Sequence, residues 1–151
     1  MSLCQIHYFT CVRLLLIPMP LSSKKAWLDV QKDDQVHVRL KLLIEKGHMP
    51  PQKKTGGDHN KLKLLHNLFK KGELKIDKDG LILVRIVTKG EARWVTSIPS
   101  KIFPGLSSAL HLRFAHPSKG QQISLMQRYF YCPGYREIIA QTVDNCSQCM
   151  A

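Results

Sequence analysis

The residues of this chain that are best suited to chemistry lie in its final third. His111 and His116 are separated by four residues, and a Cys-Ser-Gln-Cys segment much further along supplies Cys146 and Cys149. Two imidazoles and two thiolates form one of the ligand sets that bind Zn²⁺ tetrahedrally, and sites closed by four protein ligands are structural rather than catalytic. The spacing therefore predicts one structural zinc ion held by these four side chains.

The interval between the two histidines decides which elements must carry them. Five residues correspond to about 500° of helical rotation, so that one face of a helix cannot present both imidazoles. Pro117 disfavours the helical conformation at His116. We therefore expect His111 in the last turn of a helix and His116 in the loop that follows it.

The segment between the ligand pairs must leave the site and return to it. A helix capped by Ser118 is expected to run to about Phe130, and a second helix is expected from Tyr135 to Cys146. Cys132-Pro133-Gly134 forms a turn that separates these two helices. Two helices of about twelve residues each extend about 18 Å in opposite directions, which returns the cysteines to the histidines. With the helix that carries His111, they make a small three-helix zinc-binding unit.

These residues resemble the N-terminal HHCC zinc-binding domain of retroviral and retrotransposon integrases. The segments HPSKGQ, RYFYCPG and DNCSQC are most similar to those of BEL/Pao and gypsy-like retrotransposons. A looser resemblance extends upstream over AWLDVQKDDQ, KIDKDGLILV and VTSIPSKI, so that it covers about residues 24–149. Pro117 replaces the Gly that is usual in gypsy-like elements, and Cys132 stands where a Trp is common. Neither difference removes a ligand.

The resemblance implies a module that binds the DNA ends of the element and helps integrase to form homo-oligomers, ahead of a catalytic core in which three carboxylates bind two metal ions. After Glu91 the only acidic residues are Glu137 and Asp144. Because this chain has no such carboxylate triad, we expect no enzyme activity and no small-molecule substrate. We interpret it as a fragment of a retroelement polyprotein. Two alternatives are a zinc-stabilised protein-interaction or multimerisation module and a domesticated DNA-binding host protein.

The net charge favours a polyanionic partner. The chain has a formal net charge of +12. Residues 24–78 contribute fourteen Lys/Arg and seven Asp/Glu, whereas residues 110–151 contribute four and two. Nucleic acid, and DNA in particular, is the leading candidate. The alternative is a lysine-rich surface that serves only solubility.

Three basic residues lie beside the predicted zinc helices, namely Lys119, Arg128 and Arg136. Together with exposed amides of Gln121, Gln122 and Gln127 they form our candidate contacts to a phosphate backbone, although solvated helix faces are equally compatible with them. For the aromatic run 129–131, packing in the core is favoured over stacking on bases.

Cysteine usage points to a reducing compartment. The chain has five cysteines, and an odd number excludes a complete disulfide framework. We expect Cys132 to be packed rather than metal-bound, and an intracellular location, either nuclear or cytoplasmic. Residues 1–23 stay unassigned. Their apolar stretch is too short to span a membrane, and an unstructured remnant, a packed strand and a targeting segment are all compatible with it.

The fold class that these patterns predict is α+β, in four segments. After residues 1–23 we expect a basic helical linker region (24–72), a small antiparallel sheet (73–99) and the zinc-binding domain (100–151). The linker region would contain a helix that ends at Gly47, although a strand is compatible with its alternating residues, and a second helix from Asn60 to Lys70. The sheet would comprise a hairpin around Asp77–Gly80 and a third strand over residues 93–98. His7, His37, His48, His59 and His66 are expected to be surface or half-buried residues without a role.

Overall fold

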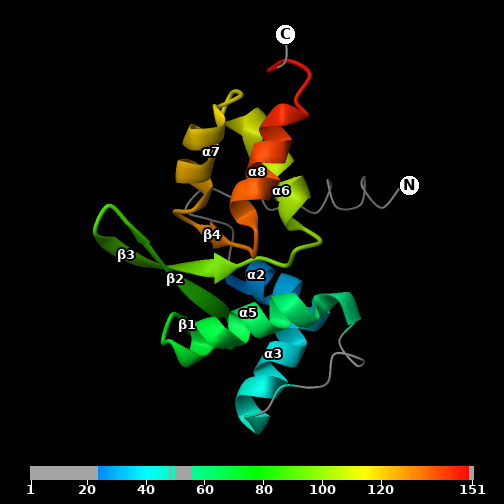
Figure 1. Ribbon diagram of the computed structural model, residues 1–151, viewed down its shortest axis with the longest axis vertical. Helices are drawn as coiled ribbons and strands as arrows, with labels where there is room; N and C mark the ends of the chain where they lie inside the picture. Colours follow the sequence, from blue (N-terminus) through cyan, green and yellow to red (C-terminus); the bar gives the residue numbers. More distant parts are fainter. Residues whose placement is uncertain (1–23, 48, 50–55, 150–151) are drawn as a thin grey trace.

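The computed structural model describes residues 24–47, 49 and 56–149, and Figure 1 shows their arrangement. A four-stranded sheet lies between two groups of helices. On one side are α6 (Phe103–Arg113), α7 (Lys119–Met126) and α8 (Tyr135–Asp144), and on the other are α3 (Gln35–Lys46) and α5 (His59–Lys70). Helix α2 (Lys24–Lys32) lies near the middle, and a short 3-10 turn, η1 (Gly56–Asp58), precedes α5. The α+β class is confirmed.

The N-terminal region forms two helices where the sequence pattern predicts one. The helix is interrupted between α2 and α3 because the Asp34 carboxylate accepts a hydrogen bond from the backbone N–H of His37 at 3.1 Å and so caps α3. Helix α3 ends at Gly47, as predicted, with a left-handed φ of 80°. Helix rather than strand is therefore the correct assignment for this stretch. Residues 1–23, which stay unassigned, and residues 48 and 50–55 of the basic helical linker region lie outside the described residues.

The hairpin is confirmed in position. Strand β1 (Leu74–Ile76) pairs antiparallel with β2 (Ile82–Thr88), and β2 pairs with β3 (Glu91–Ser97). In the first turn Oδ1 of Asp77 accepts the backbone N–H groups of Asp79 and Leu81, each at 2.9 Å, and Gly80 supplies the positive φ of 94°. The predicted third strand begins two residues earlier than expected.

The sheet has a fourth strand that the sequence pattern does not predict. Strand β4 (Phe130–Tyr131) pairs parallel with the end of β3, so the sheet is mixed rather than purely antiparallel. The helix predicted to reach Phe130 ends at Met126 instead. Phe130 is buried against the ring of Trp27, with centroids 5.4 Å apart, and this tertiary packing overrides the helical spacing.

Two clusters of buried side chains hold the described residues together, and the sheet contributes to both. The first joins Trp27 of α2 to the helices α6, α7 and α8, with Phe103, Leu106 and Ile139 at its centre. The second packs α3 and α5 on β1 and β2, with Leu40, Leu62 and Ile82 fully buried. The elements that carry the predicted zinc ligands are therefore anchored on a core that includes α2.

Candidate metal centre

His111 lies in the last turn of α6, as predicted. Leu106, Leu110 and Phe114 face the first core cluster and fix the rotation of the helix. The imidazole of His111 is only 2% exposed. Since a buried imidazole needs polar partners on both nitrogens, the two contacts it makes indicate what the site can do.

His116 lies in the loop beyond α6, also as predicted. Ala115 and His116 both have left-handed backbone conformations, with φ of 59° and 57°. Such conformations cost non-glycine residues on the order of 1–3 kcal/mol each. The His116 N–H donates to the carbonyl of His111 at 2.9 Å, and the two rings meet edge to face with centroids 4.9 Å apart. The strained turn therefore brings the second imidazole back onto the first.

Cys146 and Cys149 follow α8, which ends at Asp144, in a tight turn. The Cys146 Sγ lies 3.3 Å from Nδ1 of His116. The Cys149 Sγ lies 3.3 Å from Nε2 of His111 and 3.8 Å from Nδ1 of His116. Helix α8 runs antiparallel to the path of α7, as the out-and-back prediction requires (Figure 1).

The four ligand atoms lie within 4.8 Å of one another. In a tetrahedral zinc site with the usual Zn–N and Zn–S bond lengths, neighbouring ligand atoms are about 3.4–3.8 Å apart. The sulfur–nitrogen distances of 3.3, 3.3 and 3.8 Å agree closely with those edges. This group could therefore hold a metal ion through Nε2 of His111, Nδ1 of His116 and the two sulfur atoms.

Gln122 orients the first ligand. Its Nε2 donates to the backbone carbonyl of Ser107 at 2.8 Å, which directs its Oε1 toward Nδ1 of His111 at 2.7 Å. An amide oxygen only accepts, so Nδ1 must carry the proton, and the lone pair of Nε2 points at the sulfur of Cys149. Outer contacts of this kind fix the tautomer of metal-ligating histidines.

A hydrogen-bonded network ties this contact to all three helices of the region. Gln122 Nε2 also donates to Oγ of Ser107 at 3.0 Å, and Oγ1 of Thr142 lies 2.8 Å from the same hydroxyl. Ser107 is in α6, Gln122 in α7 and Thr142 in α8. The orientation of His111 therefore depends on the packing of the three helices.

The expectation that Gln122 is exposed is wrong, because its side chain is fully buried. Gln121 and Gln122 are adjacent and chemically identical, and only the rotation of α7 against α6 distinguishes them. The one available signal is spacing, since Gln122 precedes the buried Met126 by four residues and so shares its face. Gln121 instead completes a capping box with Ser118, which confirms the predicted cap.

The two thiols differ in acidity. Hydrogen bonding from the backbone N–H of Cys149, with smaller contributions from Gln148 and the His111 side chain, lowers the pKa of Cys146 to about 6. Partial desolvation and the neighbouring sulfur of Cys146 raise the pKa of Cys149. By contrast, burial raises the pKa of Cys132 to about 11. Cys132 is fully buried, as expected for a packed residue, and lies 3.7 Å from Oγ of Ser100.

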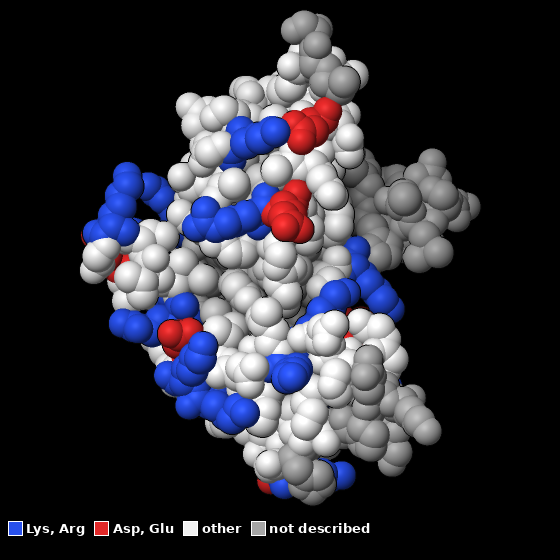
Figure 2. All heavy atoms as spheres, in the orientation of Figure 1, with Lys and Arg blue, Asp and Glu red and all other residues white. Residues whose placement is uncertain are grey.

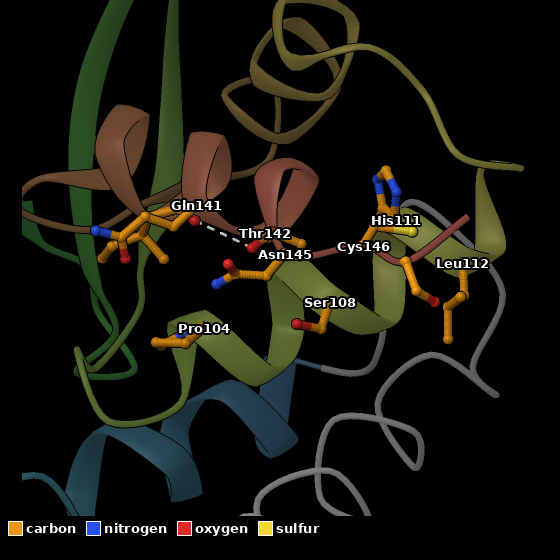
Figure 3. Close-up of a pocket in the computed structure, with 10 residues that line it drawn as sticks. Pro104, Ser108, His111, Leu112, Gln141, Thr142, Asn145 and Cys146 are labelled. Carbon is orange, nitrogen blue, oxygen red and sulfur yellow. Dashed lines mark hydrogen bonds between the residues drawn. The ribbon is translucent and has the colours of Figure 1, made fainter. Parts of the chain in front are cut away.

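A groove of about 420 Å³ runs between α6 and α8 along one side of the cluster. Figure 3 shows His111 and Cys146 at one end of this groove and Pro104 at the other. Leu112, on its rim, is 55% exposed. The metal-ligand cluster is therefore close to a surface that also offers apolar contact.

The three basic residues predicted to contact phosphate lie at different points around the helices. The Lys119 Nζ forms an ion pair with Asp144 at 2.6 Å, between the start of α7 and the end of α8. The Arg136 guanidinium lies over the Tyr135 ring, 5.5 Å from its centroid, and Arg128 is exposed between α7 and β4. In Figure 2 the Lys and Arg side chains over α7 and α8 lie beside acidic groups. The positive potential of this region is correspondingly moderated.

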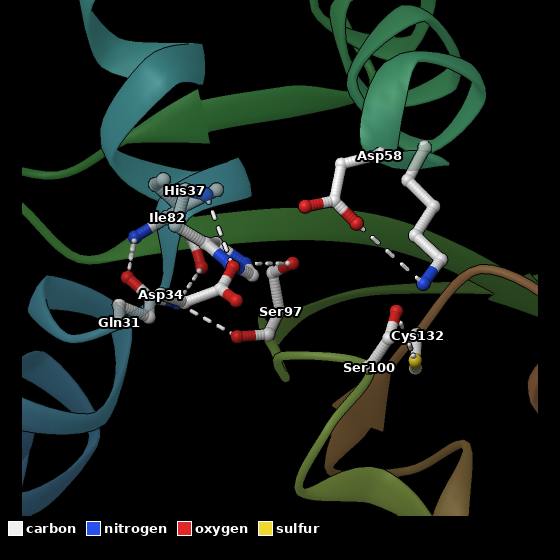
Figure 4. A network of polar contacts seen from close by, with 9 residues as sticks. Gln31, Asp34, His37, Asp58, Ile82, Ser97, Ser100 and Cys132 are labelled. Carbon is white, nitrogen blue, oxygen red and sulfur yellow. Dashed lines mark hydrogen bonds and ion pairs between the residues drawn. The ribbon is translucent and has the colours of Figure 1, made fainter. Parts of the chain in front are cut away.

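A second polar network, away from the cluster, joins α3 to the sheet (Figure 4). Nδ1 of His37 lies 2.5 Å from a carboxylate oxygen of Asp34, and its Nε2 lies 2.7 Å from Oγ of Ser97. The expectation that His37 is at or near the surface is wrong, since it is 2% exposed. The carboxylate of Asp34, the imidazole of His37 and the hydroxyl of Ser97 form a hydrogen-bonded row, as in a catalytic triad. Ser97 is fully buried, however, so its hydroxyl is enclosed by the fold rather than presented to a substrate.

Comparison with protein-family models, with curated proteins and with solved structures yields no match. Within the part of the chain that the structure describes, no helix is long and apolar enough to cross a membrane.

Proposed function

We propose that this chain is a zinc-stabilised, non-catalytic nucleic-acid-binding module of the kind that precedes the catalytic core of retroelement integrases. The observation that carries the proposal is the convergence of His111, His116, Cys146 and Cys149 to ligand distances. These residues come from the end of one helix, the loop after it and the turn after another helix. One ion at this position would hold the three-helix region closed.

Zinc is the metal that best suits this donor set. Paired imidazoles and thiolates select zinc over the hard cations, which prefer oxygen. Four protein ligands leave no open position for a substrate or an activated water, which favours a structural role. When bound, the ion supplies folding free energy on the order of 10 kcal/mol at neutral pH, because the site is absent from the unfolded chain.

Nucleic acid is the proposed partner because of the charge. The chain carries a formal net charge of +12. Lys119, Arg128 and Arg136 would contribute phosphate contacts around the zinc helices, although the ion pair of Lys119 with Asp144 weakens its contribution. Phosphate contacts release counterions, so the affinity should fall steeply as salt rises.

The test measures DNA binding by the zinc-loaded protein at several salt concentrations, with an unrelated protein of similar net charge alongside. We expect tighter binding than the control protein and loss of that advantage after zinc is removed with a chelator. Equal affinity of the two proteins at every salt concentration would reject the proposal.

One observation favours a second function, that of a protein-interaction or multimerisation module. Leu112 is 55% exposed on the rim of the groove beside the cluster, and the charges of α7 and α8 are partly paired there. Sedimentation of the zinc-loaded protein and of Leu112→Ser distinguishes the two. A dimer that this substitution dissociates, together with DNA binding no stronger than the control, would support the second function over the first.

A further inference from the structure

The face of the sheet that points away from α3 and α5 carries an exposed tryptophan between two basic residues. The register places Arg85 opposite Trp94 and Lys75 opposite Leu83. Because side chains alternate along a strand, Lys75, Leu83, Arg85 and Trp94 share one face. Val84 and Val95 point to the other face and are buried. We refer to Lys75, Arg85 and Trp94 as the sheet patch.

The core covers this face only in part. Leu83 packs against the first core cluster, but beyond it the β2–β3 hairpin extends past the helices (Figure 1). Trp94 is 40% exposed and Val87, further out on the same face, is 58% exposed. Arg85 and Lys75 are also exposed. An aromatic ring of this size at the surface of such a projecting hairpin is available to a partner.

The charges around the ring favour an anionic partner. The Lys75 Nζ lies 4.3 Å from the centroid of the Trp94 ring, and Arg85 is its direct neighbour across the strands. Of the nearby acidic residues, Glu91 pairs with Arg93 at 3.3 Å. Half-buried Glu73, the residue before β1, lies opposite Arg85, whose backbone N–H donates to the Glu73 carbonyl at 2.8 Å, so one carboxylate borders the two cations. In Figure 2 Lys and Arg side chains lie over the hairpin and over β1, with acidic groups among them.

An aromatic face flanked by cations fits a nucleic acid with unpaired bases. Stacking of a base on an aromatic side chain is independent of sequence, and the cations beside the ring can contact the adjoining phosphates. In a duplex both faces of each base are already stacked, so a solvent-exposed ring gains little there. Lys75 lies over one face of the Trp94 ring, and the residue is still 40% exposed, so the base would stack on the exposed part of the ring.

We propose that the sheet patch binds single-stranded nucleic acid, with one base stacked on Trp94 and with Lys75 and Arg85 contacting the adjacent phosphates. This inference rests on the proposed nucleic-acid function and identifies both a surface and a strand form for it. The sheet patch lies on β1, β2 and β3, so it predicts a contact distinct from those of Lys119 on α7 and Arg136 on α8. Because β4 pairs parallel with β3, Arg128 lies near Trp94 and would extend the sheet patch.

The experiment titrates the zinc-loaded protein with a short oligo(dT) and records both affinity and tryptophan emission. Trp27 is buried against Phe130, so quenching on binding reports Trp94. We expect quenching in the parent protein. Trp94→Leu should bind oligo(dT) about 5- to 150-fold more weakly, the range of one base–aromatic stack, whereas Trp94→Phe should retain most of the affinity.

The matched control is Val87→Ala, an exposed apolar residue of the same face, which should leave the affinity unchanged. Lys75→Gln and Arg85→Gln should each reduce the slope of log affinity against log salt by about 0.7. Circular dichroism of each variant establishes that the fold is retained, and the quenching of the parent protein needs no variant at all.

The outcomes separate the two proposals. If binding does not quench the emission of the parent protein and Trp94→Leu binds oligo(dT) as tightly as the parent, the sheet patch is overturned. The proposed function still stands in that case if the parent protein binds more tightly than the control basic protein. Binding by the parent no tighter than by the control protein would overturn both. If Trp94→Leu loses as much affinity for poly-glutamate as it loses for oligo(dT), the sheet patch is assigned to an acidic protein partner instead.

Discussion

At the scale of single residues, the amide of Gln122 determines how His111 meets the other three ligands. Gln122→Leu fills a similar volume but removes the acceptor at 2.7 Å that holds the proton on Nδ1. Loss of such an outer contact reduces metal affinity about 10- to 100-fold. We expect this decrease for zinc, measured by competition with a chromophoric chelator.

The control for this substitution is Ser124→Ala, on the exposed face of the same helix. Its zinc affinity should equal that of the parent protein. If Gln122→Leu and Ser124→Ala bind zinc equally well, Gln122 does not orient the ligand.

A second residue-scale prediction concerns Asp34, whose carboxylate both caps α3 and meets His37. Burial raises the pKa of this carboxyl, but the hydrogen bonds and charge of His37 outweigh burial and hold the pKa below its usual value of 3.8. A pKa lowered on folding contributes stability that is complete above the unfolded value and is lost as the pH falls through the folded one.

Asp34→Asn keeps a capping group but removes this charge. It should lower the free energy of unfolding at neutral pH, and the deficit should narrow only below a pH of about 4. Urea unfolding of both proteins, from pH 7 down to the lowest pH at which both are folded, measures the deficit. A deficit that is constant or grows on acidification would contradict the assigned role of the carboxylate.

At the scale of elements, the sequence predicts those parts of the fold whose signals are local. Ser118 with Gln121, Gly47 and the Asp77–Gly80 turn mark ends and reversals through their own backbone chemistry, and the structure has each of them in place. The four candidate ligands could be assigned because their spacing alone requires a helix, a loop and a return path.

The elements that the sequence pattern does not predict depend on distant partners. Phe130 has helical spacing but lies in a strand, because its position is set by Trp27 and by the backbone of β3. Gln31 is polar yet fully enclosed, since its amide bonds the backbone of Ile82 and Ser97 at 2.8–3.0 Å. The burial of His37 and of Gln122 is not predicted by the sequence pattern for the same reason. No property of the adjacent residues signals a contact made across more than fifty positions, as for Gln31, or with another helix.

At the scale of the whole molecule, the metal-ligand cluster and the core are coupled through shared helices. Trp27 belongs to the same buried cluster as Leu106, Leu110 and Met126, which lie on the helices that carry or support the ligands. Removing the metal should therefore loosen the packing around Trp27. The β2–β3 hairpin has its own turn and strand pairing and should persist.

The prediction is tested with Trp94→Phe, in which Trp27 is the only tryptophan, since the chain has two. Chelation should shift its emission to longer wavelength and reduce helical circular dichroism, while amide protection of β2 and β3 is retained. Unchanged emission and helix content, with removal of zinc verified by elemental analysis, would show that the ion is not needed for this packing.

The central claim is that four side chains from three places in the final third of the chain close on one ion. The most direct measurement is the zinc content of the protein, purified without added metal or metal-affinity resin, beside those of Cys149→Ser and Cys132→Ala. We predict one zinc per chain in the parent protein and in Cys132→Ala, and well under one in Cys149→Ser. A parent protein that contains no metal and takes up none from buffered zinc would contradict this account.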